Sequence, residues 1–391
     1  MSAMLGPTPR HSVLFANNFP GPTLGGGEVH LMHLIRGAIA AEWQVSVAAA
    51  KGSALAGDAR AVGADVFELE YSRARMPTKP GLLRDIAAAY DADVIVGTGF
   101  LTNMLVRRAA AGLEGTAVVN IVHTEPDAAR HEGSGPLRLG MRRRVDASSR
   151  DRVDRFVAIS SAVRNAICAG GVEPERVVTI PNGIDIATVR SDAGLPAPEG
   201  LRAAGPLVGC VGRLAPVKGV EYFIRMAGPL GFQVPRARFV IAGSGPEESR
   251  LRGIAYAYGL GDRLVFLGHV SPVAPVLAAC DVVVIPSLSE GFALVAAEAM
   301  ALGKPVVGTN VGGLVDVVAD GETGILVPPA DPEALAAAVA RLLHDPALSI
   351  RMGEAGAARA EEHFTVDRMV RDHLALFEEL ATRGAHGAPS S

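Results

Sequence analysis

Short apolar runs rich in Val, Ile and Ala alternate with helical patterns along almost the whole chain, and this alternation restricts the fold more than any other feature. Apolar strands with helices between them are typical of a parallel sheet that is covered by helices on both faces. The alternation forms two series, separated at 191–206 by a stretch rich in Gly, Pro and Ala. A chain of 391 residues is long enough for two such domains. The sequence therefore predicts an α/β protein in which two parallel-sheet domains face a cleft.

The predicted strands are short and bounded by turn residues. In the first series they fall at 13–19, 45–50, 66–70, 94–98, 118–123, 156–160 and 177–181. In the second series they fall at 207–211, 238–242, 264–267, 282–285, 305–308 and 324–327. Helical patterns in the second series fall at 220–226, 247–258, 273–279, 293–301, 314–319 and 332–344. An amphipathic pattern at 365–380 predicts one more helix.

Composition argues against several classes of partner. The net charge is −4 and aromatic residues make up 5% of the chain, so neither a basic surface nor base-stacking aromatics favour nucleic acid. The three cysteines form no Cys-x-x-Cys pair, and Cys210 and Cys280 lie in or beside apolar runs, as expected of buried thiols in a reducing compartment. Residues 1–10 lack the apolar core of a signal peptide, and no apolar run reaches the length of about 18 residues that spans a membrane. We expect a cytoplasmic protein.

Arginine is frequent between 138 and 155. Such a stretch either rests on an anionic membrane or acceptor, or forms the solvated face of a helix. Because it contains few large apolar residues, the solvated face is favoured over peripheral membrane contact.

Two polar features stand at opposite ends of predicted strands. Asp91 and Asp93 have the spacing of a metal–diphosphate site, but they precede the strand at 94–98, whereas parallel sheets bind ligands at the carboxyl ends of their strands. We therefore expect no metal there. His123 ends its strand on the ligand-binding edge, and it is a candidate site residue although a single histidine is usually structural.

Two carboxylates, Glu290 and Glu298, follow the strand at 282–285. Glu290 falls in the loop after the strand, and Glu298 falls inside the next predicted helix, which Gly291 and Phe292 are expected to open. Free amides and the helix dipole at this point favour an anion, while the carboxylates can accept hydrogen bonds from sugar hydroxyls. The stretch predicts a site for a sugar linked to a diphosphate.

Two cations follow the first strand of the second series. Arg213 and Lys218 lie between Gly212 and Gly219, at the carboxyl end of that strand. Breaking a sugar–diphosphate bond places negative charge on the leaving group, which fixed cations can stabilise without a metal. The alternative is an ordinary surface pair.

A glycine-rich turn at 25–28 follows the first strand and precedes a helix predicted at 29–41. Such a turn lets backbone amides approach a phosphate, or it simply connects two elements. The turn does not contain the Gly-x-Gly-x-x-Gly of dinucleotide-binding domains or the Gly-Lys-Ser/Thr of a P-loop.

Several segments together resemble the retaining glycosyltransferases of family four (glycosyl transferases group 1). The most specific is Glu290 and Glu298 followed by Ala-Met-Ala-Leu-Gly-Lys-Pro-Val-Val. The others, in matching order, are 177–185, Gly212-Arg213-Leu214 with Lys218-Gly219, 266–268, and Asp320-Gly321 with Gly324. The resemblance covers nearly the whole chain and implies the GT-B architecture, two Rossmann-like domains with the last helix crossing back to the first.

The resemblance implies the following division: an acceptor-side domain at 1–195, a nucleotide-sugar domain at 196–364, a returning helix at 365–383, and a disordered tail at 384–391. It implies that Arg213 and Lys218 bind the donor diphosphate, that Glu298 holds the ribose, and that Glu290 and His123 lie at the transferred sugar. Arg213, Lys218, Glu290 and His123 are thus the implied catalytic residues. Backbone contacts to the donor are implied at Gly26, Gly27, Gly291, Phe292, Ala293 and Leu294.

The implied reaction transfers a sugar from a nucleotide diphosphate, of UDP or GDP type, to an acceptor hydroxyl with retained anomeric configuration. Neither a cofactor nor a metal is implied, and the acceptor is not identified. It is expected to bind mainly the first domain, around the glycine turn and the segment after His123. A nucleotide-sugar epimerase of the same fold is the main alternative. A glycan phosphorylase, a dehydrogenase and a binding protein without activity are less favoured, the last because Arg213, Lys218, Glu290 and Glu298 are all present.

Overall fold

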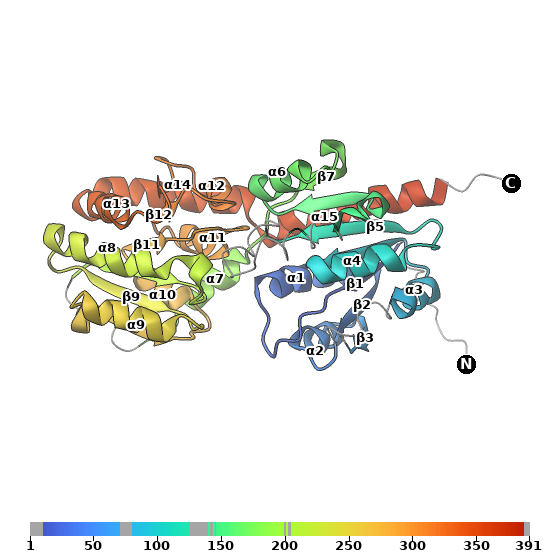
Figure 1. The fold of residues 1–391 in the computed structure, drawn as a ribbon, viewed down its shortest axis with the longest axis horizontal. Coiled ribbons are helices and arrows are strands. Elements are labelled where there is room, and N and C mark those ends of the chain that lie inside the picture. The colour runs from blue at the N-terminus through green and yellow to red at the C-terminus, as the bar shows by residue number, and fades with distance from the viewer. Residues whose placement is uncertain are drawn as a thin grey trace.

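Two parallel sheets lie side by side in the computed structural model, each with helices on both faces (Figure 1). The structure describes residues 11–70, 80–124, 140, 144, 146–198, 201 and 205–386, without the side chains of 384–386. Every strand pairing within these residues is parallel. The predicted fold class, α/β with two Rossmann-like domains, is confirmed.

The first sheet has 7 strands in the order β3-β2-β1-β4-β5-β6-β7. Its strands are β1 (Ser12–Ala16), β2 (Gln44–Ala50), β3 (Asp65–Leu69), β4 (Val94–Thr98), β5 (Ala117–Val122), β6 (Arg155–Ala158) and β7 (Val177–Thr179). Its helices are α1 (Gly26–Ala40), α2 (Ala54–Ala61), α3 (Pro80–Ala89), α4 (Phe100–Ala109) and α6 (Ser161–Ala169). Each strand lies where the sequence predicts one, and the signal is strongest at the central strands β1 and β4, which are fully buried along their whole length.

The second sheet has 6 strands in the order β10-β9-β8-β11-β12-β13. Its strands are β8 (Leu207–Val211), β9 (Arg238–Ala242), β10 (Leu264–Gly268), β11 (Val282–Ile285), β12 (Val306–Thr309) and β13 (Gly324–Val327). Its helices are α8 (Val220–Gln233), α9 (Glu248–Ala257), α10 (Ala274–Ala279), α11 (Leu294–Ala301), α12 (Leu314–Val317), α13 (Pro332–His344) and α14 (Pro346–His363). In both sheets the strand order reverses direction beside the first strand, which creates the crevice where such sheets bind ligands.

Among the helices that the structure describes, α7 (Ile186–Ala193) and α14 fall where the sequence predicted no helix. Helix α7 begins before the predicted linker and extends into it, and it packs on α10 and α11 of the second domain. Helix α14 packs on α11, where a Cβ on Gly353 would lie 2.0 Å from the carbonyl oxygen of Gly303. The two helices approach this closely only because the position has no side chain.

The last helix, α15 (Val366–His386), crosses back to the first domain, as Figure 1 shows in red, and packs on α1, β4 and β5. Phe377 is fully buried there, with its ring 6.3 Å from the rings of both Phe15 and Trp43. The crossing begins at an isolated bridge between Ile184 and Thr365. The predicted returning helix is thus present, and it extends beyond the predicted start of the disordered tail; residues 387–391 lie outside the described part.

A polar contact also joins the two domains. Ser161, at the start of α6, donates from its backbone nitrogen and its hydroxyl to the two carboxylate oxygens of Asp316 on α12, both at 2.6 Å. Arg359 of α14 holds α12 from the other side by donating to the carbonyl oxygens of Asp316 and Val317. The two domains are therefore connected at this contact as well as through α15.

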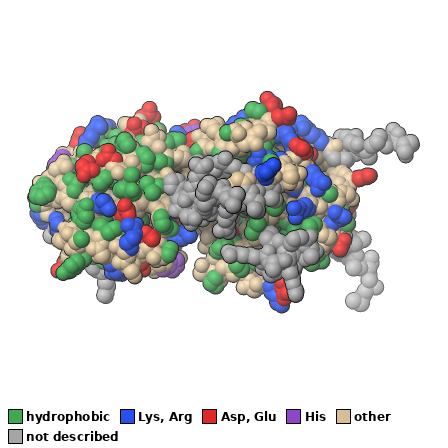
Figure 2. Space-filling view, in the orientation of Figure 1, with side chains coloured by type: hydrophobic (Ala, Val, Ile, Leu, Met, Phe, Trp, Pro, Cys, Tyr) green, Lys and Arg blue, Asp and Glu red, His purple; other side chains and the backbone are tan. Residues whose placement is uncertain are grey.

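The arginine-rich segment at 138–155 is described only in part. Arg150 is paired with Asp146, which also accepts a hydrogen bond of 2.9 Å from the buried Arg107. Arg138, Arg142 and Arg143 lie outside the described residues. None of the described helices is both long enough and apolar enough to cross a membrane. On the face shown in Figure 2, acidic and basic side chains are interspersed over both lobes.

Candidate active site

A cavity of ≈ 380 Å³ lies between the carboxyl ends of the two sheets. The predicted site residues that line it are Gly26, Gly27, His123, Arg213, Lys218, Glu290, Gly291, Phe292, Ala293 and Leu294. Asp91 and Asp93 do not line it, and Asp93 instead accepts a hydrogen bond of 2.8 Å from the backbone nitrogen of Ser12, at the amino end of β1. The structure therefore brings together nearly all of the residues predicted for one site.

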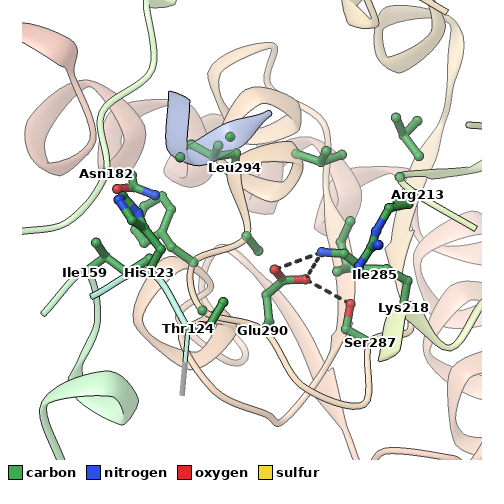
Figure 3. Close-up of a pocket in the computed structure, with 18 of the residues that line it drawn as sticks. His123, Thr124, Ile159, Asn182, Arg213, Lys218, Ile285, Ser287, Glu290 and Leu294 are labelled. Atoms are coloured by element: carbon green, nitrogen blue, oxygen red, sulfur yellow. Dashed lines mark hydrogen bonds and ion pairs between the residues drawn. The ribbon is translucent and has the colours of Figure 1, made fainter. Parts of the chain in front are cut away.

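Lys218 and Glu290 form an ion pair at the centre of the cavity (Figure 3). Lys218 Nζ lies 2.6 Å from Glu290 Oε2 and 2.9 Å from Oε1, and the hydroxyl of Ser287 donates to Oε2 at 3.0 Å. The Glu290 side chain is only 10% exposed, so the pair is well shielded from solvent. Glu290 thus holds the Lys218 ammonium at the cavity wall.

A glycine sets the position of Lys218. Gly219 has a φ of 60°, and a Cβ there would lie 2.0 Å from the carbonyl oxygen of Pro286. A side chain at 219 would therefore push the loop after β8 away from the end of β11. Arg213 follows the same strand and lies on the same side of Glu290 as Lys218 in Figure 3. Two cations thus face one wall of the cavity.

Two helix N-termini converge on the cavity. Helix α1 begins at Gly26 and α11 at Leu294, and a Cβ on Gly26 would lie 3.1 Å from Leu294 Cδ1. The unpaired amides and the positive ends of both helix dipoles therefore point to one place, which favours an anion. At α1, Glu28 accepts a hydrogen bond of 3.1 Å from the backbone nitrogen of Gly25 and so stabilises the helix start.

Both helix starts differ from those predicted. Helix α1 includes Gly26 and Gly27 in its first turn, although the sequence predicted a turn there, because Gly25 takes an extended conformation and caps the helix. Helix α11 begins later than predicted, and Gly291 and Phe292 belong to the loop. The Phe292 ring is buried 5.4 Å from that of Phe364, which turns the chain into the core before the helix begins.

Gly291 lies against the first domain. A Cβ at this position would lie 2.1 Å from the carbonyl oxygen of His123. The loop after β11 therefore touches the end of β5 across the crevice, and the cavity is closed on this side by backbone from both domains.

His123 is half-buried, but its Nε2 atom is inaccessible to solvent, and no hydrogen-bond partner of this atom is found within the described residues. Burial and, to a smaller extent, the nearby His373 lower the pKa of His123 to about 4. The imidazole is therefore neutral near pH 7. A neutral imidazole here can donate or accept a hydrogen bond to a sugar hydroxyl without bringing a charge.

Within the described residues, no three His, Cys, Asp or Glu side chains gather so as to hold a metal ion. The charged groups around the cavity are instead the cations of Arg213 and Lys218 and the carboxylate of Glu290.

Two family models match the chain, one for each domain. The model described as Glycosyltransferase Family 4 matches residues 24–188, and that described as Glycosyl transferases group 1 matches residues 195–359. The chain belongs to glycosyltransferase family 4.

Curated relatives agree with this family. A D-inositol 3-phosphate glycosyltransferase of Acidothermus cellulolyticus is 34% identical over 294 residues, which cover 70% of this chain and 64% of the relative. An alpha-D-kanosaminyltransferase of Streptomyces kanamyceticus is 40% identical over 151 residues, covering 38% of this chain and 39% of that one. The chain thus spans less than two thirds of the length of either relative.

Solved structures share the fold over the whole chain. A sucrose-phosphate synthase from Thermosynechococcus elongatus superposes with a TM-score of 0.80 at 24% identity, covering 96% of this chain and 100% of that one. The Anabaena protein HepE in complex with UDP superposes with a TM-score of 0.80 at 22% identity, covering 94% and 100%. These family 4 glycosyltransferase domains therefore have the GT-B arrangement that the sequence resemblance implied.

Glu298, the remaining predicted site residue of this family 4 chain, does not line the cavity. Leu294 and Val295 line the cavity, and Glu298 lies one turn beyond them on α11. A ligand that extends along the helix would therefore reach Glu298. Burial raises the pKa of Glu298 to about 7. Within the described residues its carboxylate has no hydrogen bond or ion pair.

Sequence reasoning missed several residues around the cavity. Thr124, Ile159, Asn182 and Ser287 all line it, and Figure 3 shows Asn182 beside His123. Asn182 stands in the segment 177–185, which carried the family resemblance, and its position there was the available signal. Beyond Thr124, the segment expected to contact the acceptor lies outside the described residues.

Proposed function

We propose that this chain transfers a sugar from a nucleotide-diphosphate donor to an acceptor hydroxyl with retention of the anomeric configuration. The observation that carries the proposal is the convergence at one cavity of Arg213, Lys218 and two helix N-termini, with Glu290 and His123 beside them. Such a set fits a molecule that is anionic at one end and rich in hydroxyls at the other.

The chemistry follows from where negative charge develops. When the bond between the sugar C1 and the diphosphate oxygen breaks, the leaving diphosphate gains charge, which Arg213, Lys218 and the helix amides stabilise. Glu290 accepts hydrogen bonds from sugar hydroxyls and keeps Lys218 in place. In front-side attack, the acceptor oxygen bonds to C1 on the face that the diphosphate leaves, and the acceptor proton passes to a diphosphate oxygen.

We further propose that the reaction needs no metal, because two cations of the chain already face the expected diphosphate position. Transfer rates should then be equal, within error, with EDTA and with added Mg²⁺. A rate that collapses in EDTA and returns with Mg²⁺ would contradict this part of the proposal.

The comparisons suggest which substrates to try first. The HepE structures are described with UDP and UDP-glucose, which favours a UDP-sugar as donor. Several relatives are named for D-inositol 3-phosphate, which is therefore the first acceptor to test. GDP, ADP and dTDP sugars are the comparison set for the donor.

The deciding experiment is thermal stabilisation by UDP, GDP, ADP and dTDP, with Glu298→Ala as the matched variant. We expect one nucleotide to raise Tm in the wild type and to bind the variant less tightly by about 1–3 kcal/mol, the scale of lost hydrogen bonds to a charged group. No stabilisation by any nucleotide would contradict the donor site. Equal stabilisation of both proteins would contradict the role of Glu298.

The product then separates the remaining alternatives. We expect an NMR spectrum showing that the glycoside has the anomeric configuration of the donor, and an inverted anomer would exclude retention. Consumption of the nucleotide sugar without any acceptor would instead indicate the epimerase alternative, which the names of the relatives do not favour.

A further inference from the structure

Three histidines from three separate elements form a histidine chain that ends at the cavity, and His30 and His373 are buried whereas His123 is half-buried. His123 follows β5, His30 lies on α1, and His373 lies on the returning helix α15. The ring of His30 is 4.9 Å from that of His123 at an interplanar angle of 83°, and 5.2 Å from that of His373 at 74°. The rings thus meet edge to face, and His30 is the link between the other two.

Polar atoms of the histidine chain are buried at an energetic cost. Both ring nitrogens of His30 and the Nε2 atoms of His123 and His373 are buried without a hydrogen-bond partner in the described residues. Leaving such a group unpaired costs about 1–3 kcal/mol, whereas a phenylalanine ring would fill the same space without that cost. A cluster that stability alone does not favour calls for a functional explanation.

One hydrogen bond fixes His373, the member of the histidine chain that lies farthest from the cavity. His373 Nδ1 lies 2.8 Å from the carbonyl oxygen of Met369, one turn earlier on α15. Because a carbonyl oxygen only accepts, Nδ1 carries the proton, and the neutral ring presents Nε2 as an acceptor. Phe377 packs edge-on against the same ring, with centroids 6.0 Å apart, and keeps its plane fixed.

We propose that His373 and His30 are positioning residues for His123: packed edge to face from the Met369 carbonyl to the cavity, they fix the ring plane and the tautomer of His123. The docking of α15 would then set the geometry of a residue at the transferred sugar. This inference rests on the proposed function for the role of His123, although the ring geometry itself does not depend on it.

Burial keeps all three rings neutral. It lowers the pKa of each histidine, and nearby histidines lower it further at His30 and His123. The Asn182 side chain opposes this shift at His30, and Asp372 and the Met369 carbonyl oppose it at His373, but burial is the larger effect. The other groups that face the chain are His33 beside His30, and Asp372 beside His373; Arg36 and Asp185 act on His33 in turn. Near pH 7 the rings therefore interact through shape and tautomer, not through charge.

The test is the ring nitrogen NMR spectrum of His123 in protein labelled with ¹⁵N-histidine, assigned by the signals lost in His123→Phe. We expect one tautomer of His123 in the wild type and a mixture of tautomers in His373→Phe and in His30→Phe, which keep the aromatic volume. The measurement uses the protein alone, so it gives an answer even if no transfer activity is found. A tautomer mixture in the wild type would itself contradict the proposal, whether or not the variants fold.

The control is Leu380→Ala, which weakens the packing of α15 at a buried residue outside the chain. We expect it to lower Tm while the His123 signals stay as in the wild type. Changes in those signals equal to those in His373→Phe would indicate a general loosening of the helix and would overturn the proposal, as would unchanged signals in both phenylalanine variants.

Steady-state kinetics provide a second test of the positioning role. A misplaced group near the chemistry reduces turnover by about 10- to 100-fold, so we expect kcat of His373→Phe to fall on that scale while the donor KM stays within about twofold. A change confined to KM would place the effect on donor binding and would contradict a positioning role for His123.

Discussion

At the scale of single residues, the Lys218–Glu290 pair explains why the cation proposed to bind the diphosphate lies beside the carboxylate proposed to bind the sugar. Glu290 holds the flexible lysine at the cavity wall. The ammonium donates to both carboxylate oxygens and keeps the third of its N–H donors for a further acceptor. A lysine fixed in this way needs little reordering when a diphosphate binds.

Removing either cation tests this view. We expect Lys218→Ala and Arg213→Ala to lower kcat by about 10²–10³-fold, the scale for losing one charge contact that stabilises the transition state. Lys51→Ala is the control, because Lys51 forms an exposed pair with Glu70 away from the cavity. Steady-state rates decide, and a near-wild-type kcat in both site variants would reject the assignment.

The pKa of Glu298 predicts a pH dependence of stability. Burial raises this pKa from 4.5 to about 7, so between these values the folded protein binds more protons than the unfolded chain. The free energy of unfolding therefore falls as pH rises from 4.5 to about 7 and levels off above that, because over this range the carboxyl ionises in the unfolded chain but stays protonated in the folded protein.

The matching variant is Glu298→Gln, which stays neutral at every pH. We expect the Tm difference, variant minus wild type, to be larger at pH 8 than at pH 5. Both proteins are measured without nucleotide. A Tm difference that is equal at both pH values would show that Glu298 does not titrate in this range.

At the scale of elements, most strands and helices were predictable, and the exceptions have a physical reason. The strands β1 and β11 are continuous apolar runs, and buried parallel strands leave that signal directly in the sequence. Helix α14 is polar on most of its surface and buries only Met352, Gly353, Gly356 and Ala360. Its packing depends on small residues, which produce no apolar periodicity, although Asp345 and Pro346 give a helix start signal.

Replacing a glycine by alanine is expected to change stability in opposite directions in helices α14 and α9. A Cβ on Gly353 of α14 would lie 2.0 Å from a backbone oxygen, whereas a Cβ on Gly253 of α9 would meet nothing within 4 Å. We expect Gly353→Ala to destabilise by about 1–3 kcal/mol through overpacking. The same substitution at Gly253 should stabilise by up to about 1 kcal/mol through helix propensity.

Urea denaturation measures both variants, with the midpoint as the readout. If the two substitutions changed stability in the same direction, the close contact between α14 and the turn at Gly303 would not exist in solution.

At the scale of the whole molecule, the site depends on contacts between the domains that local sequence patterns do not reveal. Glu290 and Arg213 could be predicted as site residues because each follows its own buried strand. Ile159 could not, because it reaches the cavity only when the second domain closes against the first, and nothing in its local sequence indicates that approach. Asn182 was marked only by the family resemblance of its segment, not by its own chemistry.

The Ser161–Asp316 contact provides a test of this closure. Hydrogen bonds to charged groups contribute about 1.5–3 kcal/mol, so losing one should speed local opening by about tenfold or more. We expect Asp316→Ala to accelerate amide hydrogen exchange in α6 accordingly, followed by mass spectrometry. Asp58→Ala, on the exposed surface of α2, should leave exchange in α6 unchanged.

No acceleration in Asp316→Ala would mean that the two hydrogen bonds do not limit the opening of α6, and that α15 and the Gly291 contact are sufficient to hold the domains together.

The position of α15 also has a consequence for synthesis. The ribosome delivers every strand of the first sheet before the helix that carries Phe377, so Phe15 and Trp43 lack that cover until α15 has been synthesised. A nascent first domain therefore exposes part of its core throughout the making of the second, and this is the period in which it is most exposed to aggregation or in need of a chaperone.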